Sequence, residues 1–216
     1  MEPEAVVLDT AELVDAACAL YREVLAAGEP GVELNPRLLA ALGRNGGSVV
    51  GLREEDRLVA FAYGFPARDG SGEYHWSQSA AVAADAQGRG LGRRLKQAQA
   101  DVVRATGTHR MRWAFDPGKG RNAHFNLDVL GARGRWYVDD FYRRPGTDRV
   151  VVEWDLAPDG GAPAGPTEVV ARLEVTPDGP PREEFHRLLD DGFVAVTCAR
   201  ADGGAVWGFA RAGESS

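Results

Sequence analysis

"AVAADAQGRGLGRRLKQAQADVV", residues 81–103, changes character in its middle. An apolar segment typical of a strand leads into it, and a helical repeat of apolar residues follows. Between the two, glycine occupies alternate positions at Gly88, Gly90 and Gly92. Glycine lets a backbone turn sharply or approach a ligand closely, because it has no Cβ. The stretch therefore predicts a strand–loop–helix unit whose loop either binds a ligand or only tightens a turn.

Three ligand-binding patterns can be compared with this loop. The dinucleotide fingerprint Gly-x-Gly-x-x-Gly fits at Gly88 and Gly90, but its third position is Arg93. The Gly-Lys-Ser/Thr ending of a P-loop is absent. In the third pattern, successive N–H groups at a helix N-terminus face a pyrophosphate, which the helix dipole also attracts. The spacing alone leaves the third pattern and a plain turn open.

Composition limits the class of protein. The chain has 216 residues, of which 44% are hydrophobic and 26% charged, and its net charge is −7. It can therefore form a sizeable core, and its acidic balance disfavours nucleic-acid binding. Cys18 and Cys198 lie in apolar stretches and are expected to be buried free thiols, so we expect neither a disulfide framework nor a metal site. With no signal-peptide pattern and no membrane-spanning apolar run, we expect a cytoplasmic protein without a membrane partner.

The order of predicted elements indicates an α/β (α+β) fold with a mixed, mostly antiparallel sheet flanked by helices. Strands are expected at 5–9, 48–55, 57–69, 73–84, 109–117, 135–144, 148–156, 168–175, 193–200 and 205–212, and helices at 10–28, 35–47, directly after the loop, 120–131 and 181–192. A segment rich in Pro, Gly and Ala, 157–167, is expected to link a main domain, 1–156, to a small α+β appendage, 168–216.

The loop and its surroundings resemble the pyrophosphate-binding motif of the GNAT (GCN5-related) N-acyltransferase superfamily. Its pattern Gln/Arg-x-x-Gly-x-Gly/Ala is matched by Gln87, Gly90 and Gly92, and an apolar strand end lies upstream at Val82. The usual proline two positions after Val82 is replaced by Ala84. The resemblance implies the GNAT fold and acetyl-CoA or another short acyl-CoA as co-substrate. It also implies that backbone groups of Val82 and Ala84 bind the pantetheine arm.

The same resemblance implies a set of pyrophosphate-binding N–H groups, those of Gln87, Gly88, Arg89, Gly90, Leu91 and Gly92. The side chains of Arg89 and Arg93 are candidates for phosphate contacts, although an amphipathic helix would also direct arginines outward. A second stretch, residues 115–142, resembles the next GNAT motif and implies that Asn122 and Phe125 contact coenzyme A. The tyrosine that this helix often carries as general acid is Leu127 here. The resemblance covers roughly residues 47–156.

Candidate catalytic groups follow from the chemistry of acyl transfer to an amine. A base must take a proton from the amine, and the leaving thiolate needs a proton or a donor. By alternation, Glu73, His75, Ser77 and Ser79 share one face of the strand before the loop. Glu73 and His75 are the candidate bases, and each could instead be a rim residue. Tyr137 and Tyr142 are the candidate acids; on one strand at most one of them faces the cleft, and a core position is the alternative.

These residues predict an acyl-CoA-dependent N-acyltransferase that acts on the amine of a small molecule or amino acid by direct attack in a ternary complex. The alternative is a non-catalytic GNAT-like module that binds acyl-CoA or another partner. The segment after the linker is expected either to pair with a second subunit, which would make a homodimer, or to cover the acceptor site.

Overall fold

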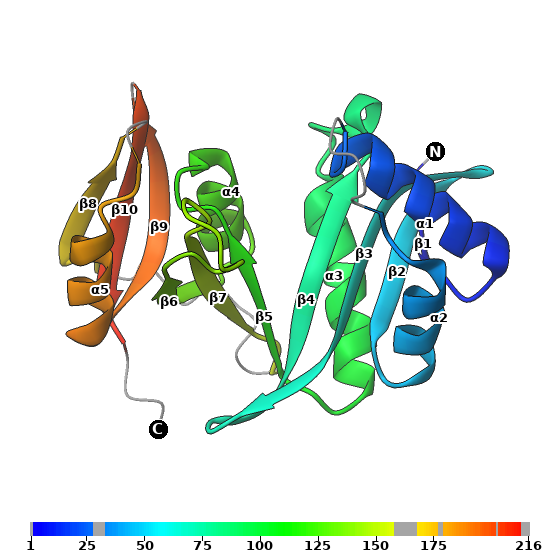
Figure 1. Cartoon of the computed structure of the whole chain (residues 1–216), viewed down its shortest axis with the longest axis horizontal. Coiled ribbons are helices and arrows are strands. Elements are labelled where there is room, and N and C mark those ends of the chain that lie inside the picture. Colours follow the sequence, from blue (N-terminus) through cyan, green and yellow to red (C-terminus); the bar gives the residue numbers. More distant parts are fainter. Residues whose placement is uncertain (1, 28–32, 158–167, 177–178, 202, 213–216) are drawn as a thin grey trace. The chain divides into compact units, whose positions relative to one another are not determined.

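The computed structural model describes residues 2–27, 33–157, 168–176, 179–201 and 203–212 (Figure 1). It divides into two compact units, residues 1–111 (unit 1) and 112–216 (unit 2). Its elements are β1 (Glu4–Val7), α1 (Ala11–Val24), α2 (Pro36–Arg44), β2 (Ser48–Glu54), β3 (Arg57–Asp69), β4 (Gly72–Val82), η1 (Ala84–Ala86), α3 (Leu91–Ala105), β5 (Arg110–Phe115), α4 (Gly120–His124), η2 (Phe125–Val129), β6 (Arg133–Val138), β7 (Arg149–Asp155), β8 (Ala171–Val175), α5 (Arg182–Asp190), β9 (Phe193–Ala201) and β10 (Gly204–Arg211).

Unit 1 is built on an antiparallel run of strands in the order β1-β2-β3-β4. Its helices begin where the sequence provides caps. The Thr10 side chain accepts the N–H of Leu13 at the start of α1, and the Asn35 side chain accepts the N–H of Arg37 at the start of α2. α1 packs on one sheet face, where Tyr21 meets Phe61. α3 packs on the other face, where Lys96 meets Ser77.

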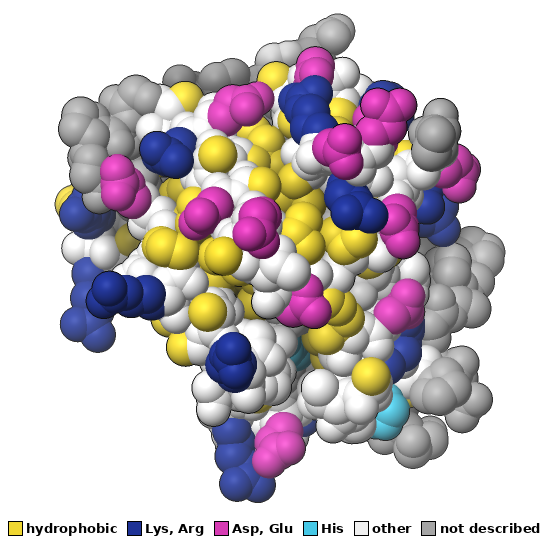
Figure 2. All heavy atoms as spheres, turned by 90° about the vertical axis from the view of Figure 1, so that its right-hand side faces the viewer, with side chains coloured by type: hydrophobic (Ala, Val, Ile, Leu, Met, Phe, Trp, Pro, Cys, Tyr) yellow, Lys and Arg dark blue, Asp and Glu magenta, His cyan; other side chains and the backbone are white. Residues whose placement is uncertain are grey.

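The core of unit 1 consists mainly of aliphatic residues, together with Cys18, Phe61 and Tyr63. The side of unit 1 that carries α1, α2 and β1 presents acidic and basic side chains interspersed around apolar surface (Figure 2). Unit 1 also carries exposed ion pairs such as Arg53 with Glu4, whose charged atoms lie 3.1 Å apart. Exposed pairs of this kind contribute little to stability.

Unit 2 contains strands in the order β5-β7-β6-β9-β10-β8, with β5 beginning at Arg110. α4 and α5 cover the same sheet face. On that face Trp113 donates to Asn126 at 3.1 Å, and Phe115 stacks on Trp207 with ring centroids 5.8 Å apart. Trp207 in turn contacts Phe185 of α5. The strands β8, β9 and β10 thus extend the sheet that β5, β6 and β7 begin.

The fold class predicted from the sequence is confirmed: the described chain is α+β, with five α-helices and mostly antiparallel pairing. The strand predicted at 135–144 was too long, because β6 ends at Val138. Asp140 and Arg143 there adopt left-handed backbone angles, φ 45° and 58°, that turn the chain. The predicted domain boundary at 157–167 lies almost wholly outside the described residues. Cys18 and Cys198 are buried free thiols, as predicted. No helix in the described ranges is long and apolar enough to cross a membrane.

Candidate functional site

The glycine-rich loop lies between η1 and α3, and two of its glycines set its shape. Gly88 and Gly90 both have φ 77°, in the left-handed region that side chains disfavour. Gly90 is the N-cap residue of α3 and its carbonyl accepts the N–H groups of Arg93 and Arg94. The N–H groups of Leu91 and Gly92 lie in the first turn of α3, where the helix itself offers them no carbonyl acceptor. The loop therefore presents backbone donors at the positive end of the α3 dipole.

The space in front of these glycines is open. A Cβ added to Gly88 or Gly90 would meet no heavy atom within 4 Å. Neither glycine is needed to avoid a clash inside the protein, so its role lies in the turn and in access to the donors. This geometry fits the pyrophosphate of coenzyme A, which needs several N–H donors and close backbone approach.

Gln87 braces the loop against the strand that leads into it. Its side-chain amide donates to the carbonyl of Val82 at 3.2 Å, so this polar group ties the loop to the end of β4. The structure places Ala84 in the turn η1 and not on the strand. The carbonyl of Ala84 accepts the N–H of Gln87, at 3.4 Å. A contact between Ala84 and the pantetheine arm remains a prediction, while Val82 closes β4 opposite Ala60.

Two arginine–carboxylate pairs flank the loop. Both terminal nitrogens of Arg89 bind the carboxylate of Glu54, one of them at 3.1 Å. Arg57 binds Asp85 in the same two-pronged way, at 2.6 and 2.9 Å. Hydrogen bonds from the arginines lower the pKa of Glu54 and of Asp85, so both carboxylates are ionised at neutral pH. Arg89, one of the two arginines predicted to contact phosphate, thus already has an anionic partner.

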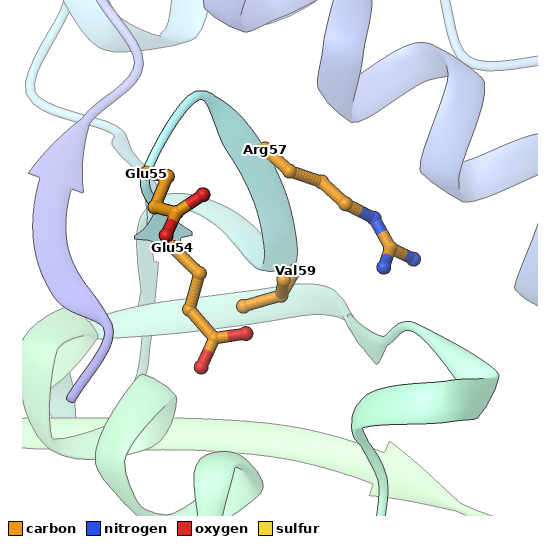
Figure 3. A pocket seen from close by; sticks show the side chains of 4 residues that line it. All are labelled: Glu54, Glu55, Arg57 and Val59. Carbon is orange, nitrogen blue, oxygen red and sulfur yellow. The ribbon is translucent and has the colours of Figure 1, made fainter. Parts of the chain in front are cut away.

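A hollow of about 360 Å³ lies beside these pairs, at the turn between β2 and β3. Its lining includes Glu54, Glu55, Arg57 and Val59 (Figure 3). In Figure 3 the side chains of Glu54 and Val59 point to the same side of the hairpin, and Arg57 extends away from both. The hollow adjoins the loop, because Glu54, which lines it, binds Arg89 of the loop. A ligand on the loop therefore has room beside it within unit 1.

β4 carries an irregularity that changes which side chains share a face. Tyr63 pairs with Ser79 but the next residue, Gly64, pairs with Ser77, so Gln78 is an extra residue in β4. Paired residues share a face, and neighbours along a strand lie on opposite faces. Ser79 therefore lies on the face opposite Ser77. The prediction that Glu73, His75, Ser77 and Ser79 line one face was wrong at Ser79, because a β-bulge breaks the alternation.

His75 and Ser77 lie in a buried polar network under α3. The imidazole Nε2 of His75 is 2.8 Å from Ser48 Oγ, and Ser48 Oγ accepts the side-chain amide of Gln99 at 2.9 Å. The amide oxygen of Gln99 accepts the Ser77 hydroxyl at 2.8 Å. Lys96 Nζ donates to Ser77 Oγ, also at 2.8 Å. The network cross-links β2, β4 and α3.

This network explains the acid–base properties of its two basic groups. Burial, followed by repulsion from Lys96, lowers the pKa of His75 to about 4. Burial lowers the pKa of Lys96 to about 7. His75 is only 2% exposed and is already hydrogen-bonded, so an acceptor amine would have to displace Ser48 or α3 to reach it. By contrast Glu73, the other candidate base, is exposed at the start of β4.

The two candidate tyrosines occupy different environments and do not share a strand. Tyr137, on β6, is buried and donates to Asp148 at 2.7 Å. Burial, reinforced by that hydrogen bond, raises the pKa of Tyr137 far above its ordinary value. Tyr142 lies in the turn after β6 and is 50% exposed. Of the two phenols, only Tyr142 is open to a ligand without rearrangement of the core.

The residues implied for the coenzyme A arm in unit 2 lie at the start of the helical segment after β5. Asn122 is exposed on α4, and its N–H bonds the carbonyl of Lys119 at 2.8 Å. Phe125 is half-buried and opens η2, a π-helical segment. Leu127, which stands where a general-acid tyrosine was considered, is 1% exposed and belongs to the core. No group of three or more metal-ligating side chains forms among the described residues.

Known proteins that resemble this chain indicate its family. The sequence model of the acetyltransferase (GNAT) family matches residues 14–125, a range that contains the whole loop. The chain belongs to this family. No curated protein matches this GNAT chain.

Solved structures of the GNAT fold agree with that assignment. A putative acetyltransferase from Salmonella typhimurium, yncA, solved with acetyl-CoA, has a TM-score of 0.60 at 19% identity, over 76% of this chain and 99% of its own. Ribosomal-protein-alanine N-acetyltransferase from Brucella melitensis has a TM-score of 0.57 at 20% identity, over 71% and 99%. Aminoglycoside 6'-acetyltransferase type Ii has a TM-score of 0.58 at 14% identity, over 73% and 99%. At these identities the likeness shows the fold, and the acceptors named differ in kind.

Several residues at this site were not singled out from the sequence. Glu54 and Asp85 pair with arginines that lie far away in the chain, and no local pattern links them. Gln99 could have been found, because Leu91, Leu95, Gln99 and Val103 are spaced by four residues and all are buried. A polar residue in a buried helical row indicates a buried partner.

Proposed function

We propose that this GNAT chain is an acyl-CoA-dependent N-acyltransferase that transfers an acetyl or other short acyl group to the amine of a small molecule or amino acid. The observation that carries the proposal is the open loop at the start of α3. Gly88 and Gly90 hold left-handed angles with free space beyond them, and the first N–H groups of α3 follow. Acyl-coenzyme A, when bound, would supply the acyl group as a thioester, and the coenzyme A thiolate would be the leaving group as the amide bond forms.

The residues of the chain have three tasks in this proposal. The N–H groups from Gly88 to Gly92 hold the pyrophosphate, because that of Gln87 bonds the carbonyl of Ala84. The side chain of Gln87 fixes the loop through Val82. Glu73 is the more accessible of the two candidate bases and takes the proton from the acceptor amine, directly or through water. Tyr142 is the accessible phenol that can return a proton to the leaving group. Direct attack is favoured over a covalent enzyme because Cys18 and Cys198 are both buried.

The loop is tested by calorimetry with coenzyme A and acetyl-CoA on a Gly90→Asp variant. The aspartate adds a negative charge beside the phosphate donors, so we expect affinity to fall by roughly tenfold or more. Gly107→Asp is the matched control, because Gly107 has φ 80° and equally open space but follows the other end of α3. Unchanged affinity in Gly90→Asp would show that the loop does not bind the pyrophosphate.

A second candidate function is the non-catalytic acyl-CoA-binding module. The observation that favours it is the burial of His75 and Tyr137, since two of the four catalytic candidates are engaged inside the protein. A thiol-release assay with acetyl-CoA over a panel of amines separates the two functions. Turnover that falls in Glu73→Gln supports the enzyme, whereas tight coenzyme A binding with no thiol release on any amine supports the module.

A further inference from the structure

The sheet face of unit 2 opposite α4 and α5 carries arginines and aromatic rings. Trp136 and Val138 of β6 pair with Val151 and Arg149 of β7, so these side chains share that face. Arg112 of β5 belongs to it too, because its guanidinium lies over Trp136, 4.5 Å from the ring centroid. We define the arginine–aromatic face by seven residues: Arg112, Arg135, Trp136, Tyr142, Arg149, Glu153 and Asp155.

A β-bulge builds this face. Gly134 pairs with Val152 but Trp136 pairs with Val151, so Arg135 is an extra residue in β6. In a regular strand Arg135 and Trp136 would point to opposite faces. At the bulge both reach the same face: Arg135 Nε lies 2.9 Å from Glu153 Oε1, and Trp136 lies beneath Arg112. Bulges commonly re-aim side chains toward functional sites.

The aromatic rings of the face are accessible. Trp136 is 38% exposed and Tyr142 is 50% exposed, so a ligand can reach each ring. Each ring has one arginine stacked on it, Arg112 on Trp136 and Arg149, at 5.0 Å, on Tyr142. Cation–π attraction from each guanidinium favours the ring orientation seen here. The two rings are thus presented together with half-buried Arg149, whereas Arg112 is only 4% exposed.

The face is positively charged although the chain as a whole is not. It carries three arginines and two carboxylates, because exposed Asp155 follows Glu153 by two residues along β7, and the net charge of the chain is −7. Glu153 is shared by Arg112, at 2.7 Å, and Arg135. The contact with Arg135 is ionic only, because within the described residues the buried Nε of Arg135 has no hydrogen-bond partner. Burial, then repulsion from Arg135, lowers the pKa of neighbouring Arg133.

Two carboxylates of the turn after β6 do not neutralise the face. Asp148 and Asp140, in the turn that carries Tyr142, both bind Arg182 of α5. Asp148 is bonded at 2.7 Å by both Arg182 and Tyr137. The excess positive charge therefore lies beside exposed aromatic surface, which is complementary to a ligand with a flat ring and an anionic group.

We propose that the arginine–aromatic face binds the acyl acceptor and that this acceptor is an aromatic amino acid or a similar amine with an aromatic ring and a carboxylate. The ring stacks against Trp136 or Tyr142, and the carboxylate meets the guanidiniums of Arg135 and Arg149. The proposal rests on the proposed function, because an acceptor site has a role only in a transferase. It narrows the acceptor from any small amine to an anionic aromatic one.

The test is calorimetry on the full chain with three probes, with and without coenzyme A. L-tryptophan has the ring and the carboxylate, L-tryptophanamide lacks the carboxylate and L-alanine lacks the ring. We expect L-tryptophan to bind at least about tenfold more tightly than either of the others, since a charge-assisted pair and a stacked ring are each absent from one of them. Equal binding of the acid and the amide, or no binding of L-tryptophan, overturns the proposal.

Variants locate the site. Arg135→Gln and Arg149→Gln should each weaken L-tryptophan about tenfold and leave L-tryptophanamide nearly unchanged, and Trp136→Ala should weaken both. Arg211→Gln is the matched control, because Arg211 stacks on Phe193 at 4.8 Å in the same unit but outside the face. Loss of affinity in Arg211→Gln alone would overturn the proposal. Normal coenzyme A binding and thiol release with carboxylate-free amines would reject the acceptor assignment while leaving the acyltransferase function intact.

Discussion

Arg89, in the glycine loop, binds the carboxylate of Glu54 with both of its terminal nitrogens. This cation is adjacent to the proposed phosphate site and is already paired in the ligand-free protein. An incoming pyrophosphate therefore competes with Glu54 for Arg89. The pair links the turn between β2 and β3 to the loop, so it can also help to hold the loop in place.

The competition leads to a prediction for Glu54→Gln. The glutamine removes a negative charge beside the loop and frees Arg89 for the ligand, so coenzyme A should bind roughly two- to fivefold more tightly, the range of an exposed ion pair. Isothermal titration at low and high salt measures this gain, which should shrink as salt screens the charges. Glu55→Gln is the control, because Glu55 lines the same hollow. Weaker binding in Glu54→Gln would mean that the ion pair chiefly maintains the loop.

A second prediction concerns Lys96, whose pKa burial lowers from 10.5 to about 7. The unfolded chain then binds this proton more tightly than the folded one, so stability rises with pH from about 7 toward 10.5. The slope from one such group is at most about 1.4 kcal/mol per pH unit. Lys96→Met removes the group and should flatten the curve. It also removes the repulsion that helps to lower the pKa of His75.

Urea denaturation at several pH values between 6 and 10 measures this effect as the difference between wild type and variant. Lys119→Met is the matched control, because Lys119 is exposed at the N-cap of α4. Parallel stability curves for wild type and Lys96→Met would show that Lys96 keeps an ordinary pKa in the folded protein.

Much of the fold could be predicted because local signals and global packing agree. The caps Thr10 and Asn35, and the alternation along β2 and β3, each indicate the element that forms. The bulges at Gln78 and Arg135 could not be predicted, since an extra residue in a strand is defined only by its partner. The burial of His75 could not be predicted either, because it depends on Ser48, which is distant in the chain.

Gly64 provides a third prediction, about the space that this network requires. A Cβ at Gly64 would lie 2.4 Å from the carbonyl oxygen of Trp76 and 2.6 Å from Nε2 of His75. The carbonyl belongs to the backbone of β4 and cannot move without distorting the sheet. Gly64→Ala should therefore destabilise the protein by about 3 kcal/mol. Gly70→Ala, where a Cβ meets nothing within 4 Å, should have little effect in the same urea titration, and equal stabilities would contradict the steric argument.

The fourth prediction separates the two tyrosines. The hydroxyl of Tyr137 donates to Asp148, which Arg182 also binds. Tyr137→Phe leaves that carboxylate with its arginine and should cost about 1 kcal/mol of stability, without change in kcat for thiol release. Tyr142→Phe keeps the ring on which Arg149 stacks and should leave stability unchanged while lowering kcat. Urea titration and steady-state kinetics on both variants give the two readouts. A kcat that falls tenfold in Tyr137→Phe but not in Tyr142→Phe would identify the buried phenol as the proton donor, and would require unit 2 to open around Asp148 during turnover.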